Sequence, residues 1–499
     1  MRYTSTRDQS LAVLSAEAIA KGISADGGLF VPEFTPQVSS DFIEELASLD
    51  YIGRAVRVLS LFLSDFSEEE LAEYAKGAYG GGKFSHEKTV PLVKLGERTH
   101  VLELWRGPTC AFKDMALQIL PYLLTGSVKK AGIGQEIVIL VATSGDTGKA
   151  ALEGFCDVAG TRILVFYPSE GVSPMQKLQM TTQKGENVGV CGIAGNFDDA
   201  QTGVKQIFTD EKIKAVFNEN NFSFSSANSI NWGRLVPQIV YYFSAYCDLL
   251  GEGKIQNGDK VNFVVPTGNF GNILAAYFAK HMGLPVNKLI CASNANNVLT
   301  DFMKTGTYDR NRQFFATASP SMDILISSNL ERLLFLMNGG NAAEIREWFA
   351  SLAKTGSYAV NGGVLSLLQS EFAAGYCDDA ATKETIKNTF EKNGYLLDTH
   401  TAVAVRVYED YVKETGDKTV SVIASTASPY KFCADVLDAV KGGAVQAKDD
   451  FSMLKELEAF TGVAAPQQLK ALKGQQPRFS QVCEKEDMQG VVLGMLGLI

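Results

Sequence analysis

The chain has 499 residues, of which 46% are hydrophobic and 20% charged, and its formal net charge is -10. This composition is typical of a folded protein, and the length exceeds what one hydrophobic core usually serves, so we expect several domains. The negative charge and the lack of a dense Lys/Arg run argue against nucleic acid or an anionic membrane as partner and favour a small molecule.

The cysteines and the apolar runs limit the type of protein further. The eight cysteines are scattered without a Cys-x-x-Cys pair, which predicts neither a metal site nor a disulfide framework. We see no signal-peptide pattern and no apolar run near the ~20 residues that span a bilayer. We therefore expect a cytoplasmic protein with no membrane partner.

Residues 1–95 are predicted to form an N-terminal helical cap. Apolar residues recur at helical spacing over residues 39–78, and Ser67 and Glu70 have the spacing of a capping box. Three consecutive glycines, residues 80–82, then end the helical pattern.

From residue 137 onward, short strand-like runs alternate with helical stretches. The runs are residues 137–141, 163–167, 188–192, 261–265, 289–292 and 420–424. This alternation predicts an α/β fold with parallel sheets covered by helices. The segment around residues 196–221 separates two groups of runs. We therefore expect a small lobe (residues 96–225), a large lobe (residues 226–440), a cleft between them and a helical tail (residues 441–499).

Polar loops follow several of the predicted strands, at the sheet edge where ligands of open parallel sheets bind. The loop of residues 266–272 stands between a strand and a helical pattern, an arrangement that favours a phosphate, with a plain strand-to-helix turn as the alternative. The loop of residues 143–149 is not a P-loop, because Thr143 replaces the first glycine and Ala150 replaces the magnesium-binding Ser or Thr. ATP hydrolysis is therefore disfavoured.

Lys113 follows Phe112 at the start of a helical pattern over residues 115–123. Apolar neighbours can desolvate a lysine, which favours the neutral amine that forms an imine. A surface lysine at a helix start is the alternative.

Eight ordered blocks resemble the threonine synthase family of fold-type-II pyridoxal-phosphate (PLP) enzymes, over most of the chain. They are residues 24–32, 107–114, 143–148, 175–182, 227–234, 266–272, 319–323 and 425–427. The resemblance implies two fold-type-II lobes around a cleft, with Lys113 holding PLP as a Schiff base.

The resemblance also implies the other cofactor ligands. Thr426 would meet the pyridine nitrogen, where a neutral hydroxyl does not force protonation, and Asp146 would lie near the ring hydroxyl. The cofactor phosphate would be cradled by Gly268, Asn269, Phe270, Gly271 and Asn272.

Two further blocks match substrate-binding positions of the family. Thr143, Ser144 and Thr147 belong to the loop that grips the substrate carboxylate. The substrate phosphate is assigned to Asn228, Ser229, Asn231 and Arg234, with helix capping and a surface salt bridge as the alternative.

The sequence departs from the family pattern at two positions. Arg106 stands where His usually precedes Gly-Pro-Thr, and Ser428 stands where His usually follows the Ser-Thr-Ala block. His400 lies in a family-like block, and we expect it to make a structural hydrogen bond at a helix start.

The implied activity is that of threonine synthase, a carbon-oxygen lyase that catalyses the last step of threonine biosynthesis. It converts O-phospho-L-homoserine and water to L-threonine and phosphate by γ-elimination and β-addition of water, and we expect a monomer or homodimer whose lobes close on the substrate. The alternatives are another fold-type-II activity, such as serine/threonine dehydratase or cysteine synthase, and a non-catalytic binding protein with the same fold.

Overall fold

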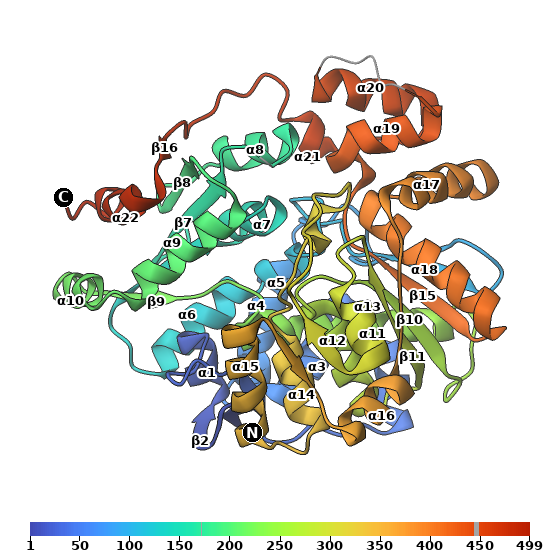
Figure 1. The fold of residues 1–499 in the computed structure, drawn as a ribbon, viewed down its shortest axis with the longest axis horizontal. Coiled ribbons are helices and arrows are strands. Elements are labelled where there is room, and N and C mark those ends of the chain that lie inside the picture. The colour runs from blue at the N-terminus through green and yellow to red at the C-terminus, as the bar shows by residue number, and fades with distance from the viewer. Residues whose placement is uncertain (171, 444–448) are drawn as a thin grey trace.

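The computed structural model describes residues 1–170, 172–443 and 449–499, and its core is built on two sheets that are mainly parallel (Figure 1). The five-stranded sheet has the order β16-β8-β7-β6-β9, and all its strands run parallel. Its members are β6 (Glu136–Ala142), β7 (Thr161–Pro168), β8 (Val188–Ile193), β9 (Phe222–Ser225) and β16 (Val482–Cys483). The helices of this part are α7 (Asp146–Phe155), α8 (Pro174–Thr181), α9 (Phe197–Thr209) and α10 (Glu211–Glu219).

The six-stranded sheet has the order β14-β11-β10-β15-β5-β4, with only β4 antiparallel to its neighbour. Its strands are β4 (Leu92–Lys94), β5 (Thr99–Glu103), β10 (Val261–Pro266), β11 (Val286–Ser293), β14 (Phe372–Tyr376) and β15 (Val420–Ser425). Near-continuous apolar runs such as Val261–Pro266 are buried along their length, as expected of parallel strands covered on both faces.

Helices surround the six-stranded sheet. Helix α11 (Trp232–Gly251) is buried almost throughout, which explains why it is apolar on all sides. Helices α12 (Gly271–His281), α13 (Val298–Thr305), α16 (Gly362–Glu371) and α18 (Thr399–Thr415) contact its strands. Further helices pack against other helices: α5 (Asp114–Leu117), α6 (Leu120–Lys130), α14 (Leu330–Met337), α15 (Ala342–Thr355) and α17 (Asp379–Asn393). A small antiparallel pair, β12 (Thr307–Asp309) and β13 (Ser357–Ala359), and the short helices η1 (Pro320–Met322) and η2 (Pro429–Phe432) complete this part.

All six predicted strands are confirmed, each extended by one to four residues in total, as β6, β7, β8, β10, β11 and β15. The α/β class with two largely parallel sheets is confirmed as well. The two sheets draw on interleaved parts of the chain, because β4 and β5 join the six-stranded sheet and β16 returns to the five-stranded one. The domain boundaries given above stay a prediction.

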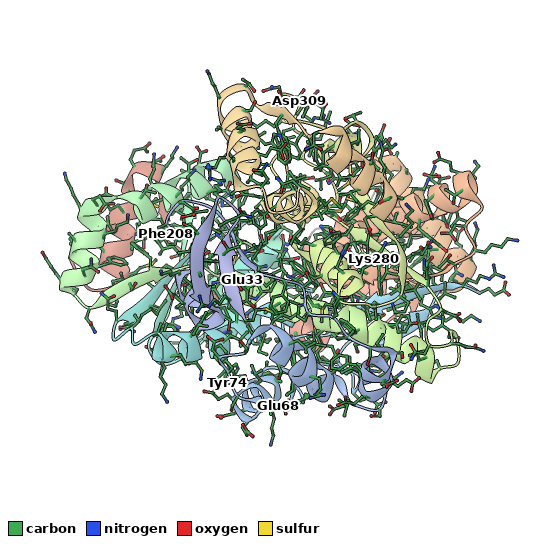
Figure 2. All side chains as sticks on the ribbon, turned by 90° about the horizontal axis from the view of Figure 1, so that it is seen from below. Glu33, Glu68, Tyr74, Phe208, Lys280 and Asp309 are labelled. Carbon is green, nitrogen blue, oxygen red and sulfur yellow. The ribbon has the colours of Figure 1, made fainter. Side chains whose placement is uncertain are left out.

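The N-terminal region contains the predicted helices and a small sheet that was not predicted. Helices α2 (Ser40–Ala47), α3 (Tyr51–Phe62) and α4 (Glu68–Tyr79) occupy the helical pattern, and the capping box of Ser67 and Glu70 is formed. They follow an antiparallel sheet of β1 (Arg2–Ser5), β2 (Asp8–Leu14) and β3 (Phe30–Pro32), with α1 (Ser15–Lys21) between its strands. In Figure 2, Glu68 and Tyr74 mark α4 on the side of the molecule opposite Asp309.

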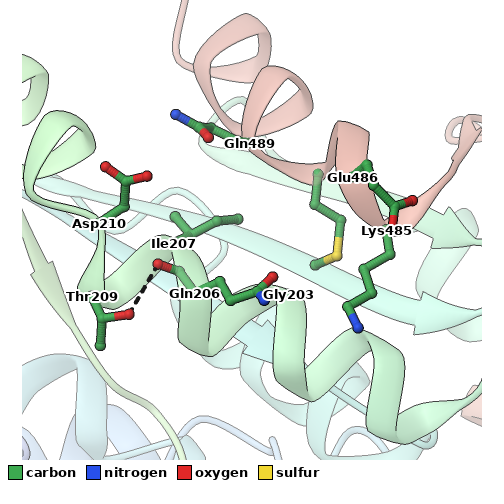
Figure 3. A pocket seen from close by; sticks show the side chains of 9 residues that line it. Gly203, Gln206, Ile207, Thr209, Asp210, Lys485, Glu486 and Gln489 are labelled. Atoms are coloured by element: carbon green, nitrogen blue, oxygen red, sulfur yellow. Dashed lines mark hydrogen bonds between the residues drawn. The ribbon is translucent and has the colours of Figure 1, made fainter.

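The C-terminal part passes from one sheet to the other (Figure 1). Helices α19 (Cys433–Lys441), α20 (Asp450–Thr461) and α21 (Gln467–Lys470) come first, and then β16, η3 (Lys485–Asp487) and α22 (Met488–Met495) pack on the five-stranded sheet and α9. Residues 444–448 of the predicted tail lie outside the described residues. Figure 3 shows a groove between α9 and this end of the chain, lined by residues such as Gln206, Lys485 and Gln489 and by none of the predicted site residues.

The described ranges show neither a membrane-spanning helix nor a metal-binding cluster. No helix in them is both long and apolar enough to cross a membrane. They also contain no group of three or more His, Cys, Asp or Glu side chains placed to hold a metal ion.

Candidate active site

Loops from the carboxyl ends of three strands supply the predicted cofactor-binding residues other than Lys113 and the residues predicted for the substrate carboxylate. The loop of residues 266–272 follows β10, and Thr426 follows β15, the neighbour of β10 in the six-stranded sheet. The loop that begins at Thr143 follows β6 in the five-stranded sheet. In each sheet these loops lie at the edge where ligands of parallel sheets bind, and the contact of Lys113 with Asp146 brings the two edges together.

Lys113 lies immediately before α5 and is fixed to the end of β15. The Phe112 N–H donates to the Thr426 carbonyl at 2.8 Å. The Lys113 Nζ donates to Ser321 Oγ at 3.3 Å and lies 3.9 Å from Asp146 Oδ2, and the side chain is only 12% exposed. Burial lowers the pKa of Lys113 to about 8, against the opposing attraction of Asp146. A neutral, nucleophilic amine is therefore accessible close to neutral pH.

The carbonyls of the loop that follows β10 are held by its neighbours. Ser327 Oγ donates to the Gly268 carbonyl at 2.7 Å, and the Asn329 backbone N–H and side-chain NH2 both donate to the Asn269 carbonyl at 3.1 Å. In the described part of the chain, no backbone N–H of residues 268–272 donates to a protein acceptor. Helix α12 begins at Gly271, so its positive dipole end adds to these free donors, and the loop is suited to an anion.

Asn272 adds a side-chain donor to the same loop. Its Oδ1 accepts hydrogen bonds from the hydroxyls of Tyr241 and Tyr242 on α11, at 2.5 Å each. Its Nδ2 is buried and has no partner among the described residues. A buried donor without an acceptor costs about 1–3 kcal/mol, which an anionic oxygen would offset. The donor set therefore fits the phosphate of PLP.

The backbone of the loop is itself unusual. Phe270 has a left-handed conformation (φ 65°) at the start of α12, although it is not glycine. A Cβ atom added at Gly268 would lie 2.7 Å from the Ser321 carbonyl, so only glycine fits there. Such strained or crowded backbone positions concentrate at ligand sites.

Asp146 is the first residue of α7, and one of its two carboxylate oxygens is bound by two side chains. Its Oδ1 lies 2.5 Å from the Lys431 Nζ and accepts a hydrogen bond from Gln176 Nε2 at 2.8 Å. Burial by itself would raise the pKa of Asp146, but the charges of Lys431 and Lys113 outweigh it and hold that pKa well below its ordinary value. Asp146 therefore carries a negative charge beside Lys113.

The side chains of the remaining loop residues differ in whether they already form hydrogen bonds within the protein. The Thr143 hydroxyl accepts from the N–H groups of Gly145 and Gly148 at 3.0 and 2.9 Å, so it shapes its own loop. The hydroxyls of Ser144, Thr147 and Thr426 make no hydrogen bond to another described residue, and all three remain available to a ligand. Their assigned roles stay predictions.

Arg234 is a buried cation without a counter-ion among the described residues. Its Nη1 donates to the Ala227 carbonyl at 2.8 Å, it forms no ion pair with any described carboxylate, and burial lowers its pKa to about 10. The surface salt bridge considered for it is therefore not formed. Asn231 does cap α11 and also bonds two carbonyls through its NH2 group, whereas Asn228 and Ser229 are half-buried nearby in sequence. Arg234 has the surroundings of an anion ligand.

Comparison with known proteins decides the family. The model described as pyridoxal-phosphate dependent enzyme matches residues 86–426, and those for the threonine synthase N terminus and C-terminal part match residues 2–79 and 401–492. The chain is 38% identical to threonine synthase of Saccharomyces cerevisiae, over 88% of this chain and 89% of the relative. The chain belongs to the threonine synthase family.

Other members of the family support the same placement. The solved yeast threonine synthase structure superposes with a TM-score of 0.88 at 34% identity, covering 100% of this chain and 99% of that one. PLP-bound threonine synthase from Brucella melitensis gives 0.87 at 36% identity, covering 99% of each chain. Human threonine synthase-like 1 is 42% identical over 85% of this chain, which spans 58% of that longer protein.

The two departures from the threonine synthase pattern have local partners in this chain. The Arg106 Nε donates to Glu103 Oε2 at 2.7 Å, and its guanidinium lies over the Trp105 ring. Ser428 is buried and caps η2 by accepting the Tyr430 N–H at 3.3 Å. Among the described residues, neither side chain forms a hydrogen bond or an ion pair with Lys113.

Sequence reasoning missed several residues of the site. Ser321 and Gln176 lie inside recognised threonine synthase blocks, but only their contacts show that they face Lys113 and Asp146. His400 makes the expected hydrogen bonds, since its Nε2 accepts the Ser321 N–H at 3.1 Å and its Nδ1 lies 3.1 Å from Asp398. Nothing in the sequence pattern indicated that Lys431 belongs to the site, except its position four residues after a recognised block.

Proposed function

We propose that this chain is a threonine synthase that converts O-phospho-L-homoserine and water to L-threonine and phosphate, with PLP held by Lys113. The observation that carries the proposal is two separate sets of anion-binding groups that have no anionic partner among the described residues. The first set is the N–H groups of residues 268–272 with Asn272 Nδ2, and the second is centred on Arg234. Ser321 contacts Lys113 and approaches Gly268 of the first set, and the charge of Arg234 in the second set acts on Lys113. The first set fits the cofactor phosphate, and the second leaves a place for a phosphate on the substrate. Dehydratase substrates carry no phosphate and would have no use for it.

The proposed reaction assigns a role to each of the site residues. When bound, PLP supplies an electron sink for carbanions that form next to the substrate amine. Lys113 would hold PLP in the absence of substrate and, as a free amine, would remove the substrate Cα proton and later return one. Ser144 and Thr147 bind the substrate carboxylate, and Arg234 with Asn228 and Ser229 binds the phosphate that leaves.

Water has to be excluded during the elimination and admitted for the addition at Cβ. We infer that closure of the two lobes controls this access. The proposal also includes a cytoplasmic location, which the eight free cysteines suit, and a monomeric or homodimeric protein.

Replacing Lys113 is the decisive test of the proposed chemistry. We expect Lys113→Ala to lower turnover by more than about 100-fold while leaving the circular dichroism spectrum unchanged, because the amine that moves the proton is lost. The assay is joint release of phosphate and threonine from O-phospho-L-homoserine by purified protein.

The outcomes of this assay separate the alternatives. Equal amounts of both products, absent with Lys113→Ala, would establish the activity. Phosphate without threonine would indicate diverted elimination, and neither product, together with borohydride-trapped PLP on Lys113, would favour another fold-type-II substrate. Failure to trap PLP at all would favour a binding protein.

A further inference from the structure

Lys431 is a second lysine beside the reactive one, and it is held far more tightly. Its side chain is 0% exposed, and its Nζ lies 2.5 Å from Asp146 Oδ1 and donates to the Thr109 carbonyl at 3.0 Å. Lys113 is partly exposed and makes one hydrogen bond of 3.3 Å. Lys431 is therefore unable to serve as the imine-forming amine, and its burial calls for another role.

The Asp146 carboxylate lies between the two lysines. Its Oδ1 faces Lys431, and its Oδ2 lies 3.9 Å from the Lys113 Nζ. Gln176 from α8 donates to the Oδ1 as well, so the orientation of the carboxylate is fixed from the side of Lys431. A buried charge needs a partner, and Lys431 is the partner in contact.

The charges around Lys113 come from three elements. Asp146 on α7 favours its protonated form, whereas Arg234 on α11 and Lys431 on η2 disfavour it. The neighbouring Asp114 is engaged elsewhere, since its carboxylate accepts from the Thr109 N–H and hydroxyl at 2.8 and 2.7 Å. Without Lys431, Lys113 would be the only lysine counter-ion of Asp146 among the described residues, and an ammonium group held in an ion pair does not attack a carbonyl.

We infer that Lys431 is a positioning residue that acts as the fixed counter-ion of Asp146 and thereby leaves the Lys113 amine free to react near neutral pH. This inference rests on the imine-forming role of Lys113 proposed above, but it does not depend on the identity of the substrate. Lys431 acts mainly by balancing the Asp146 charge, in addition to its own repulsion of protonated Lys113, so its removal should matter less once Asp146 is neutral.

The test measures the reactivity of Lys113 without any turnover. Apoprotein is mixed with PLP across a pH series, and the rate of imine formation is followed by absorbance and confirmed by borohydride trapping and peptide mapping. For the unaltered protein we expect the rate to rise with pH and to level off near the Lys113 pKa of about 8. The ionisations of PLP itself are common to all variants, so a difference between profiles reports on the protein.

Three variants isolate the effect. Lys431→Met keeps the length of the side chain but removes its charge, and we expect the midpoint of the profile to rise by about one to three pH units. Lys431→Arg keeps the charge and should leave the midpoint closer to that of the unaltered protein. In the double variant Lys431→Met with Asp146→Asn, the midpoint of the profile should fall again, because the charge that Lys431 balances is gone.

The inference is overturned if folded Lys431→Met protein keeps the original midpoint, or if the double variant shows the same rise as the single one. If Lys431→Met does not fold, the Asp146→Asn variant serves as the test. The inference requires that this variant lower the midpoint of the pH profile, and an unchanged midpoint contradicts it. A trapped adduct on a residue other than Lys113 would instead overturn the proposed role of Lys113.

Discussion

The oxygen and the nitrogen of the Asn272 side-chain amide differ in their hydrogen-bond partners. The oxygen is saturated by the hydroxyls of Tyr241 and Tyr242, whereas the buried NH2 group has no partner in the described ranges. The two tyrosines fix the orientation of the amide, because only the oxygen accepts a hydrogen bond. The site thus presents a donor and no acceptor at this point, which selects an anion.

Replacing Asn272 by Asp tests this selection. The new carboxylate can still accept from both tyrosines, but it places a negative charge where a donor stood. We expect the dissociation constant of PLP to rise by at least about tenfold, the equivalent of losing a hydrogen bond to a charged group of about 1.5–3 kcal/mol. Equilibrium dialysis measures the constant, and Tyr242→Phe, which leaves the amide in place, is the control. Unchanged affinity in Asn272→Asp would contradict the role of the amide.

The loop between β10 and α12 acts as one element. Its carbonyls accept hydrogen bonds from Ser327 and Asn329, and Phe270 adopts a left-handed conformation, so its N–H groups find no protein acceptor in the described part of the chain. The conformation depends on close approach of the Ser321 backbone to Gly268. The loop is therefore shaped before any ligand binds, which lowers the cost of ordering it.

Two glycines of this loop provide a matched pair of substitutions. In Gly268→Ala the new Cβ would lie 2.7 Å from a backbone oxygen, whereas in Gly271→Ala its nearest neighbour would be Asn329 Nδ2 at 3.5 Å, an ordinary contact. We expect Gly268→Ala to destabilise the apoprotein by about 1–3 kcal/mol, seen as a lower denaturant midpoint, and Gly271→Ala to change it much less. Equal effects of the two substitutions would argue against a crowded loop.

At the scale of the whole molecule, the proposed site draws on both sheets. Lys113, residues 268–272 and Thr426 accompany the six-stranded sheet, whereas Ser144, Asp146 and Thr147 follow β6 of the five-stranded one. A substrate bound through both its carboxylate and its phosphate would contact groups of both lobes. Its binding energy is then available to draw the lobes together.

This closure is measurable by X-ray scattering. We expect the radius of gyration of the PLP-loaded protein to decrease when a non-reactive phosphonate analogue of the substrate is added. Arg234→Gln, which removes the unpaired buried cation, should abolish the decrease at the same analogue concentration. Identical scattering profiles with and without the saturating analogue would rule closure out.

Local pattern alone was enough to predict much of this protein. The six strands, the helical pattern of the N-terminal region and the capping box at Ser67 were found because each depends on residues close together in the chain. The recognised blocks likewise singled out Lys113 and residues 266–272. Among the missed strands, β16 is only two residues long and pairs with β8, which is distant in the chain, whereas β4 is only three residues long and pairs with β5 alone, at the edge of its sheet.

The tertiary structure decided which side chains meet. Lys431 and the carbonyl of Thr109 lie 322 residues apart in the chain but 3.0 Å apart in space, and the tyrosines that orient Asn272 belong to another helix. Contacts of this kind leave no periodic or spaced pattern in the sequence, because they depend on how the two sheets and their helices pack. The amino-acid sequence therefore singled out the lysine that we propose as the reactive one, and only the fold determined the charges that surround it.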